Sequence, residues 1–157
     1  MKYRALTWDK EKKSYKWVYG LPSYGFETEE IAEIGTPYGD FYEINPATLG
    51  RQTEYIDKNK KPIYTGDITI LEANGEVKEF EVVEVTTDRE YNTLLGFEGE
   101  TVKVRLSNVI AFRWIAPDGN IFNLLPCVSE TGIVDTELME IIDTAAERVL
   151  RESESKR

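Results

Sequence analysis

The segment from Asn45 to Leu71 constrains the fold most, because it alternates turn-forming residues with short runs suited to β-strands. Asn45-Pro46 opens a turn, since proline fixes φ and keeps the preceding residue out of the α region. A second turn follows at residues 57–60, where Asp and Asn side chains bond nearby backbone groups. We therefore predict a short strand at Gln52–Ile56 between the two turns.

Gly66-Asp67 stands directly before the apolar run Ile68-Thr69-Ile70-Leu71. The glycine permits a bend, and the aspartate carboxylate can accept backbone N–H bonds where a strand begins. A catalytic aspartate is the rival interpretation. The turn chemistry of the pair favours the structural role for Asp67.

Three pairs of aromatic or β-branched runs are separated by turn residues, which is the pattern of β-hairpins. The pairs are Tyr3–Trp8 with Tyr15–Tyr19, Ile68–Ala73 with Val77–Thr86, and Val109–Ile115 with Ile121–Leu125. Asn74-Gly75 is the strongest of the turn signals, because both residues tolerate positive φ. A change of alternation near Val82-Val83 is typical of a β-bulge.

Other parts of the chain give weaker signals. Residues 102–106 alternate like a strand, and Ser107-Asn108 marks a break after them. Asp40–Ile44 also alternates like a strand, whereas Glu27–Ile34 suits either a short helix or an irregular acidic segment. Tyr91–Gly99 is expected to be a loop.

The last segment changes to a helical period. Apolar side chains recur there at the spacing of one helix face, at Leu138, Ile141, Ile142, Ala145 and Val149. With Asp135 or Thr136 as N-cap, we predict an amphipathic helix from about Thr136 to Arg151. Its apolar stripe should cover either the β-domain or a neighbouring subunit, and the β-domain is the more ordinary choice.

These elements predict a single domain over residues 1–157, a length that suits one ordinary core. The parts are an N-terminal hairpin with an acidic segment (1–44), a barrel core (45–126) and a C-terminal helix (135–151). Short strands joined by hairpins favour an antiparallel sheet curled into a small SH3-like barrel. The expected fold is therefore mainly β, with additional hairpins and one C-terminal α-helix.

The chain has no histidine, which excludes Ser-His-Asp and Cys-His catalysis and every imidazole metal site. Its one cysteine, Cys127, allows no internal disulfide and suits a reducing cytoplasm. The sequence shows neither a Gly-rich phosphate loop nor the carboxylate spacing of a calcium loop. We expect no catalytic residue, no cofactor and no metal.

The net charge of −10 is unevenly distributed. Residues 1–19 carry six basic and two acidic side chains, a local charge of +4, and the acidic residues dominate beyond them. An acidic surface repels phosphate, so binding of nucleic acid by the bulk surface is disfavoured. No apolar run approaches the roughly 20 residues of a membrane span and no signal peptide is evident, so a membrane location is not expected.

The central segment carries a recognisable series of residues: Pro46, Thr48, Leu49, Gly50, Thr53, Asp57, Lys58, Asn59, Ile63, Tyr64, Gly66, Asp67 and Ile68. Lys2-Tyr3-Arg4-Ala5 and Trp8-Asp9-Lys10 add a second match near the start. Together they resemble the YopX-like family of phage and prophage proteins. Arg51, Gln52, Glu54 and Lys60 depart from the family pattern, and the last two replace its usual glycines.

The resemblance covers about a quarter of the chain. It implies an SH3-like barrel and the cytoplasm of a bacterial host, but no known activity. We interpret its signature positions as structural, because they are turn formers and strand residues.

Three functions compete. The first is a non-catalytic phage or prophage accessory protein that binds an unknown phage or host protein. The second is related to nucleic acid: either the aromatic N-terminal face, with Tyr3, Arg4, Trp8 and Trp17, stacks on single strands, or the acidic surface imitates DNA. The third, a hydrolase with paired carboxylates, lacks a spacing that singles out a pair.

Oligomerisation is a further expectation. Aromatic and β-branched strands leave sheet edges that can pair with another copy, and the C-terminal stripe offers an apolar surface. We therefore expect a homo-oligomer, with a monomer as the alternative.

Overall fold

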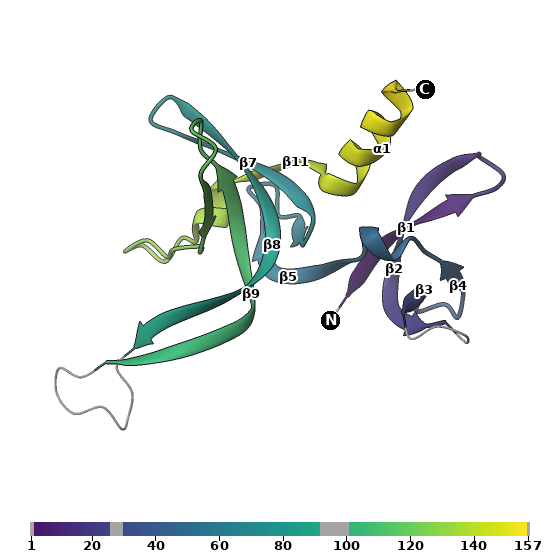
Figure 1. The fold of residues 1–157 in the computed structure, drawn as a ribbon, viewed down its shortest axis with the longest axis horizontal. Coiled ribbons are helices and arrows are strands. Elements are labelled where there is room, and N and C mark those ends of the chain that lie inside the picture. Colours follow the sequence, from purple (N-terminus) through teal and green to yellow (C-terminus); the bar gives the residue numbers. More distant parts are fainter. Residues whose placement is uncertain (1, 26–29, 92–100, 157) are drawn as a thin grey trace.

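The alternating runs form two antiparallel sheets, followed by one C-terminal helix (Figure 1). The computed structural model describes residues 2–25, 30–91 and 101–156. The first sheet has the strand order β4-β3-β2-β1-β5-β6 and the second the order β10-β9-β8-β7-β11. The protein is thus mainly β, as predicted.

The first sheet contains β1 (Tyr3–Asp9), β2 (Ser14–Tyr24), β3 (Ile31–Gly35), β4 (Phe41–Glu43), β5 (Gly50–Ile56) and β6 (Pro62–Tyr64). The second contains β7 (Asp67–Ala73), β8 (Glu76–Tyr91), β9 (Val102–Ile115), β10 (Ile121–Leu124) and β11 (Glu140–Thr144). Two 3₁₀ helices, η1 (Pro46–Thr48) and η2 (Asp135–Leu138), precede β5 and β11, and α1 (Ala145–Ser155) follows β11. No described helix has the length and apolar character needed to cross a membrane.

The two sheets do not close into the barrel that the sequence analysis predicted. A barrel needs continuous pairing around its circumference. Here β1 pairs with β5 only at Tyr3 and Arg4, and β6 pairs with no strand of the second sheet. Figure 1 shows β5 crossing from the first sheet to the side of the second.

Each half of the molecule has its own apolar cluster. Ala5, Val18, Ile34 and Ile44 are buried within the first sheet and the segment after β4. Ile63, Phe80, Val82, Phe112 and Met139 form the second cluster, which joins the β5–β6 hairpin to the second sheet. The β5–β6 hairpin therefore belongs to one sheet by pairing and to the other by packing.

The predicted helix from Thr136 to Arg151 is wrong over its first half. Residues 140–144 form β11, which pairs with β7, and α1 begins only at Ala145 with Thr144 as N-cap. The edge of β7 offers unpaired backbone groups, and pairing with them outweighs a helical period of apolar residues. Ile142 and Val149, both on the predicted stripe, are largely exposed.

Three smaller expectations can be compared with the structure. Residues 31–34 belong to β3 and not to a helix, while residues 26–29 lie outside the described chain. β9 continues through the expected break at Ser107-Asn108, but its register with β8 shifts there, and Asn108 adopts a positive φ of 56°. The extra residue of this bulge therefore lies in β9, and the pairing of β8 is regular at Val82-Val83, where a bulge was predicted. The predicted loop at 91–99 lies mostly in undescribed residues.

Candidate functional site

A buried ion pair lies at the junction of the two sheets. Arg4 of β1 donates to Oδ1 of Asp67, the first residue of β7, and both side chains are almost entirely buried. The other carboxylate oxygen of Asp67 accepts the N–H of Tyr64 at 2.8 Å. Gly66 allows this approach, because its φ of +89° suits glycine.

Aromatic rings enclose the Arg4 guanidinium on both sides. It lies 4.5 Å from the centroid of the Trp17 ring and 4.6 Å from that of Tyr64. The indole N–H of Trp17 donates to Glu147, which belongs to α1. Burial raises the pKa of Asp67, although Arg4 and the Tyr64 N–H act in the opposite direction. The pair joins β1, β6 and β7, and Trp17 of β2 connects it to α1. Because both side chains are almost entirely buried, the pair offers no exposed group to a substrate.

A second buried carboxylate fastens the turn before β6 to β11. Oδ1 of Asp57 accepts the N–H groups of Asn59 at 2.8 Å and Lys61 at 2.9 Å. Oδ2 accepts the N–H of Ile141 at 3.2 Å. The backbone N–H of Lys58 donates to the carbonyl of Met139, and its side chain forms an ion pair with Glu140 at 2.7 Å. The outer side of β11 is therefore partly covered.

The remaining signature residues also hold the backbone. Thr48 Oγ1 accepts the N–H of Leu6, and Thr53 Oγ1 donates to the carbonyl of Ile63, both at 2.8 Å. A Cβ at Gly50 would lie 2.5 Å from the carbonyl oxygen of Thr65, so this crossing requires glycine. Pro46 lies in η1. The signature positions thus follow the path of the chain between the sheets and do not converge on one hollow.

Lys60 shows the effect of a departure from the signature. It stands where the YopX-like pattern has glycine, and it adopts a positive φ of 64°. The turn therefore keeps its left-handed residue although the side chain has changed.

Three of the four residues of the candidate N-terminal contact face, Arg4, Trp8 and Trp17, lie on one side of the β1–β2 hairpin, and Tyr3 lies on the other. Arg4 is buried, and Trp17 is held against Arg4 and Glu147. Tyr3 is half-buried and neighbours Arg4 along β1, so it points to the opposite face. Trp8 is 49% exposed and packs edge to face against Tyr15, with the ring centroids 5.0 Å apart.

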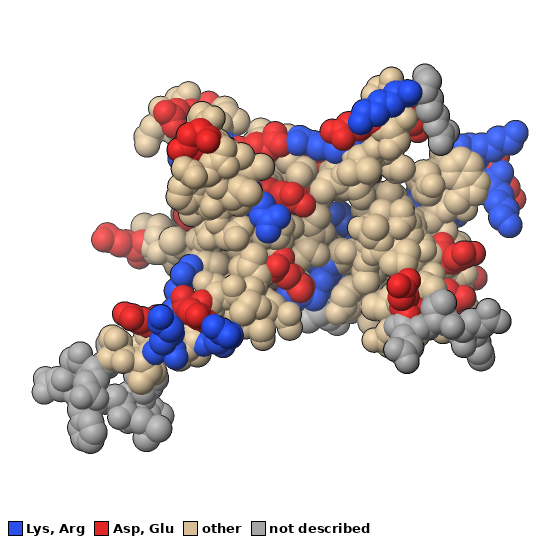
Figure 2. Space-filling view, in the orientation of Figure 1, with Lys and Arg blue, Asp and Glu red and all other residues tan. Residues whose placement is uncertain are grey.

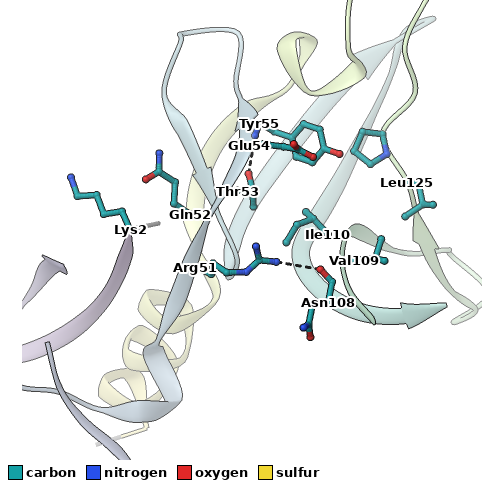
Figure 3. A pocket seen from close by; sticks show the side chains of 11 residues that line it. Lys2, Arg51, Gln52, Thr53, Glu54, Tyr55, Asn108, Val109, Ile110 and Leu125 are labelled. Carbon is teal, nitrogen blue, oxygen red and sulfur yellow. Dashed lines mark hydrogen bonds between the residues drawn. The ribbon is translucent and has the colours of Figure 1, made fainter. Parts of the chain in front are cut away.

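A polar groove of about 710 Å³ runs between β5 and β9. Figure 3 shows Arg51 reaching across it to the carbonyl of Asn108, a hydrogen bond of 3.3 Å. Arg51 also forms an ion pair with Glu84. Within the described chain, no group of three Cys, Asp or Glu side chains could hold a metal ion. The described residues of the groove therefore form no arrangement typical of a catalytic or metal site.

The second sheet ends in an exposed strand, β10, which among the described strands pairs with β9 alone. The hydrogen bond from Ala116 N–H to the Asn120 carbonyl starts this ladder, and the register pairs Phe122 with Trp114. In an antiparallel ladder, alternate residues direct their backbone groups to opposite sides. Ile121 and Asn123 therefore direct theirs away from β9, where no described residue meets them.

An apolar hollow of about 260 Å³ begins at the end of β10. Its walls come from β7, β8, β9 and the segment after β10: Leu71, Phe80, Phe112, Leu124, Leu125, Pro126, Cys127 and Met139, with Asp135 as the charged member. The sequence predicted a strand at Ile121–Leu125. It carried no signal that this strand would end the sheet or border a hollow.

Comparisons with family models, curated proteins and solved structures gave no match for this chain.

Proposed function

We propose that this chain is a non-catalytic accessory protein of a phage or prophage, and that it binds a partner protein at the open edge of β10. The observation that carries the proposal is an unpaired edge without a charged residue, Ile121-Phe122-Asn123-Leu124. Proteins ordinarily protect such edges with charges, proline or a covering segment. An edge left in this state suits a partner that adds a strand.

The side chains beside this edge supply the second requirement of strand addition, which is a place for alternate side chains of the partner. Phe122 stacks on Trp114 with the ring centroids 5.6 Å apart and remains 44% exposed. Leu124 follows two residues later on the same face and borders the apolar hollow. A partner strand could therefore place one apolar side chain over Phe122 and the next into the hollow.

The occupant we propose is an extended segment of a different protein. The net charge of −10 opposes contact between copies. A bacterial cytoplasm and a phage or host partner follow from the YopX-like resemblance. Self-pairing of β10, which would produce the expected homo-oligomer, is the alternative outcome of the test.

The experiment uses a proline substitution to prevent a partner strand from pairing with this edge. Asn123→Pro removes an N–H that points away from β9, so the β9–β10 ladder should survive. Asn123→Ala is the matched control, because both variants lose the hydrogen bond from Arg113 to the Asn123 side chain. A photo-reactive amino acid at Ile121 is introduced into the native chain and both variants in prophage-carrying cells, and the adducts are identified by mass spectrometry.

We expect one adduct that the native chain and Asn123→Ala share and that Asn123→Pro loses. The same adduct from all three chains would overturn strand addition at this edge. A cross-linked product at twice the chain's mass of 18.0 kDa would show that the occupant of the edge is a second copy of this chain.

A further inference from the structure

The opposite end of the molecule carries an exposed aromatic pair among lysines. Trp8 and Tyr15 flank the β1–β2 hairpin loop and are 49% and 45% exposed. Figure 1 places this hairpin on the far side of the molecule from the second sheet. Exposed large aromatic side chains are typical of binding surfaces when they occur together and are rimmed by polar residues.

A hollow of about 320 Å³ lies between this hairpin and α1. Its apolar walls are Leu6, Trp8, Tyr15, Trp17 and Leu150. The bond from Trp17 to Glu147 fixes α1 against the hairpin, so the hollow is part of the folded structure. Its walls suit one large apolar side chain.

The excess of basic charge lies on the hairpin side of the hollow. Lys13 lines the hollow, Lys10 and Lys12 lie in the adjoining hairpin loop, and α1 contributes Arg151, Glu147 and Glu154 to the lining. Lys10, Lys12 and Lys13 make no ion pair with any residue that the structure describes, whereas Lys16 lies 3.3 Å from Asp9. Figure 2 shows basic side chains gathered at this hairpin, at the right of the view. In a chain of net charge −10, such a local excess attracts negative groups and repels few of its own neighbours.

Two features favour a protein segment over a nucleic acid. The Trp8 and Tyr15 rings meet at 73°, so they do not present parallel faces to successive bases. Glu147 and Glu154 line the hollow, and Glu43 lies across the hairpin beside Trp8 and Tyr15. These carboxylates would repel a continuous phosphate backbone, whereas the flexible side chains of a peptide can turn their carboxylates toward the lysines.

We propose that the β1–β2 hairpin and α1 form a docking surface for a short acidic protein segment that contains one large apolar side chain. The apolar side chain enters the hollow, and carboxylates on either side of it meet Lys10, Lys12 and Lys13. This surface is separate from β10 and does not depend on the function proposed for that edge.

The probe is a fluorescent synthetic peptide, Glu-Asp-Glu-Phe-Glu-Asp-Glu, whose binding to the full chain is followed by anisotropy at 0.15 M salt. A second peptide has serine in place of phenylalanine, and a ten-nucleotide thymidine strand represents nucleic acid. The double variant Lys10→Gln with Lys12→Gln is compared with Lys61→Gln with Lys103→Gln, which removes the same charge from exposed lysines elsewhere. Lys13 is left intact, because its φ of 51° gives it a turn role.

We expect the phenylalanine peptide to bind about tenfold more tightly than the serine peptide, and the Lys10/Lys12 variant to weaken it by about tenfold. The Lys61/Lys103 variant should bind like the native chain. Equal affinity for the two peptides, equal effects of the two double variants, or tighter binding of the thymidine strand would each overturn the proposal. So would the absence of peptide binding at millimolar concentration.

Discussion

The two edge strands of the second sheet, β11 and β10, differ in whether their outward backbone groups have hydrogen-bond partners. At the β11 edge, Asp57 accepts the N–H of Ile141, and the Lys58 N–H donates to the carbonyl of Met139. At the β10 edge, Ile121 and Asn123 direct their backbone groups outward without a described partner. The same sheet thus has one edge covered by the signature segment and one edge left open.

The difference separates residues that hold the fold from residues available to a partner. Buried carboxylates at the covered side each make several bonds to the backbone or to Arg4, and their removal should affect stability. The open side consists of exposed uncharged residues, and substitutions there should affect binding alone. Each of the following predictions tests one side of this comparison.

The largest effect is expected from Asp67→Ala. It would leave the Arg4 guanidinium buried without its carboxylate, and breaking such a pair typically destabilises a protein by about 3–5 kcal/mol. Urea unfolding gives the free energy directly. The double variant Arg4→Met with Asp67→Leu should lose less than Asp67→Ala, because no unpaired charge is left. A loss below about 1 kcal/mol for Asp67→Ala would contradict a structural role for the pair.

Asp57→Ala should destabilise the chain by about 3 kcal/mol, because three backbone N–H groups lose a charged acceptor. Hydrogen exchange of the Ile141 amide should accelerate more than that of the β8 amides. Asp118→Ala is the control: Asp118 accepts the N–H of Asn120 in an exposed turn, so its loss should be about 1 kcal/mol or less. Equal losses in both variants would show that Asp57 does not hold β11.

Ile121→Lys should change the free energy of unfolding by no more than about 0.5 kcal/mol, because the side chain is 61% exposed. The same substitution places a charge on the open edge, so it should abolish the cross-linked adduct when the photo-reactive amino acid is placed at Asn123 instead of Ile121. Val149→Lys, at a residue of similar exposure on α1, should leave the adduct intact. Loss of the adduct in both variants would point to a general charge effect.

The smallest effect concerns pH. Burial alone would raise the pKa of Asp143, but hydrogen bonds from Arg151 and Arg148 and from the Thr144 N–H hold it below its ordinary value of 3.8. A carboxylate with a lowered pKa in the folded state stabilises the protein above its ordinary pKa, and this contribution is lost as the pH falls further. Asp143→Asn should therefore reduce stability slightly at pH 7 and flatten its decline below about pH 4. If Asp143→Asn leaves the loss of stability at low pH unchanged, Asp143 does not help to hold α1.

The sequence predicted the elements that local chemistry decides. The hairpins at Asn74-Gly75 and at residues 117–120 form as expected, because their turn residues alone specify them. β3 and β11 were missed, because their pairing depends on which neighbouring edges are free after folding. Both apolar clusters draw on strands that the alternation identified.

The site followed less directly from the sequence. The signature drew attention to Asp57 and Asp67, but Arg4 is 63 residues from Asp67 and nothing local links them. Trp8 and Trp17 suggested a common face, and the register places them on one, because Leu6 pairs with Trp17 and Trp8 with Tyr15; the contact of Trp17 with Arg4 and Glu147 had no local signal. Contacts of this kind depend on the complete tertiary arrangement.

The contact between Trp17 and Glu147 joins residues 130 positions apart, and β11 adds a further late strand to the second sheet. Contacts so distant in sequence slow folding, because a long loop must close before they form. During synthesis, the N-terminal hairpin therefore leaves the ribosome long before α1 exists to cover it. Until α1 is made, Trp17 lacks its Glu147 acceptor and its side of the hairpin stays uncovered, so the nascent chain is open to misassociation there.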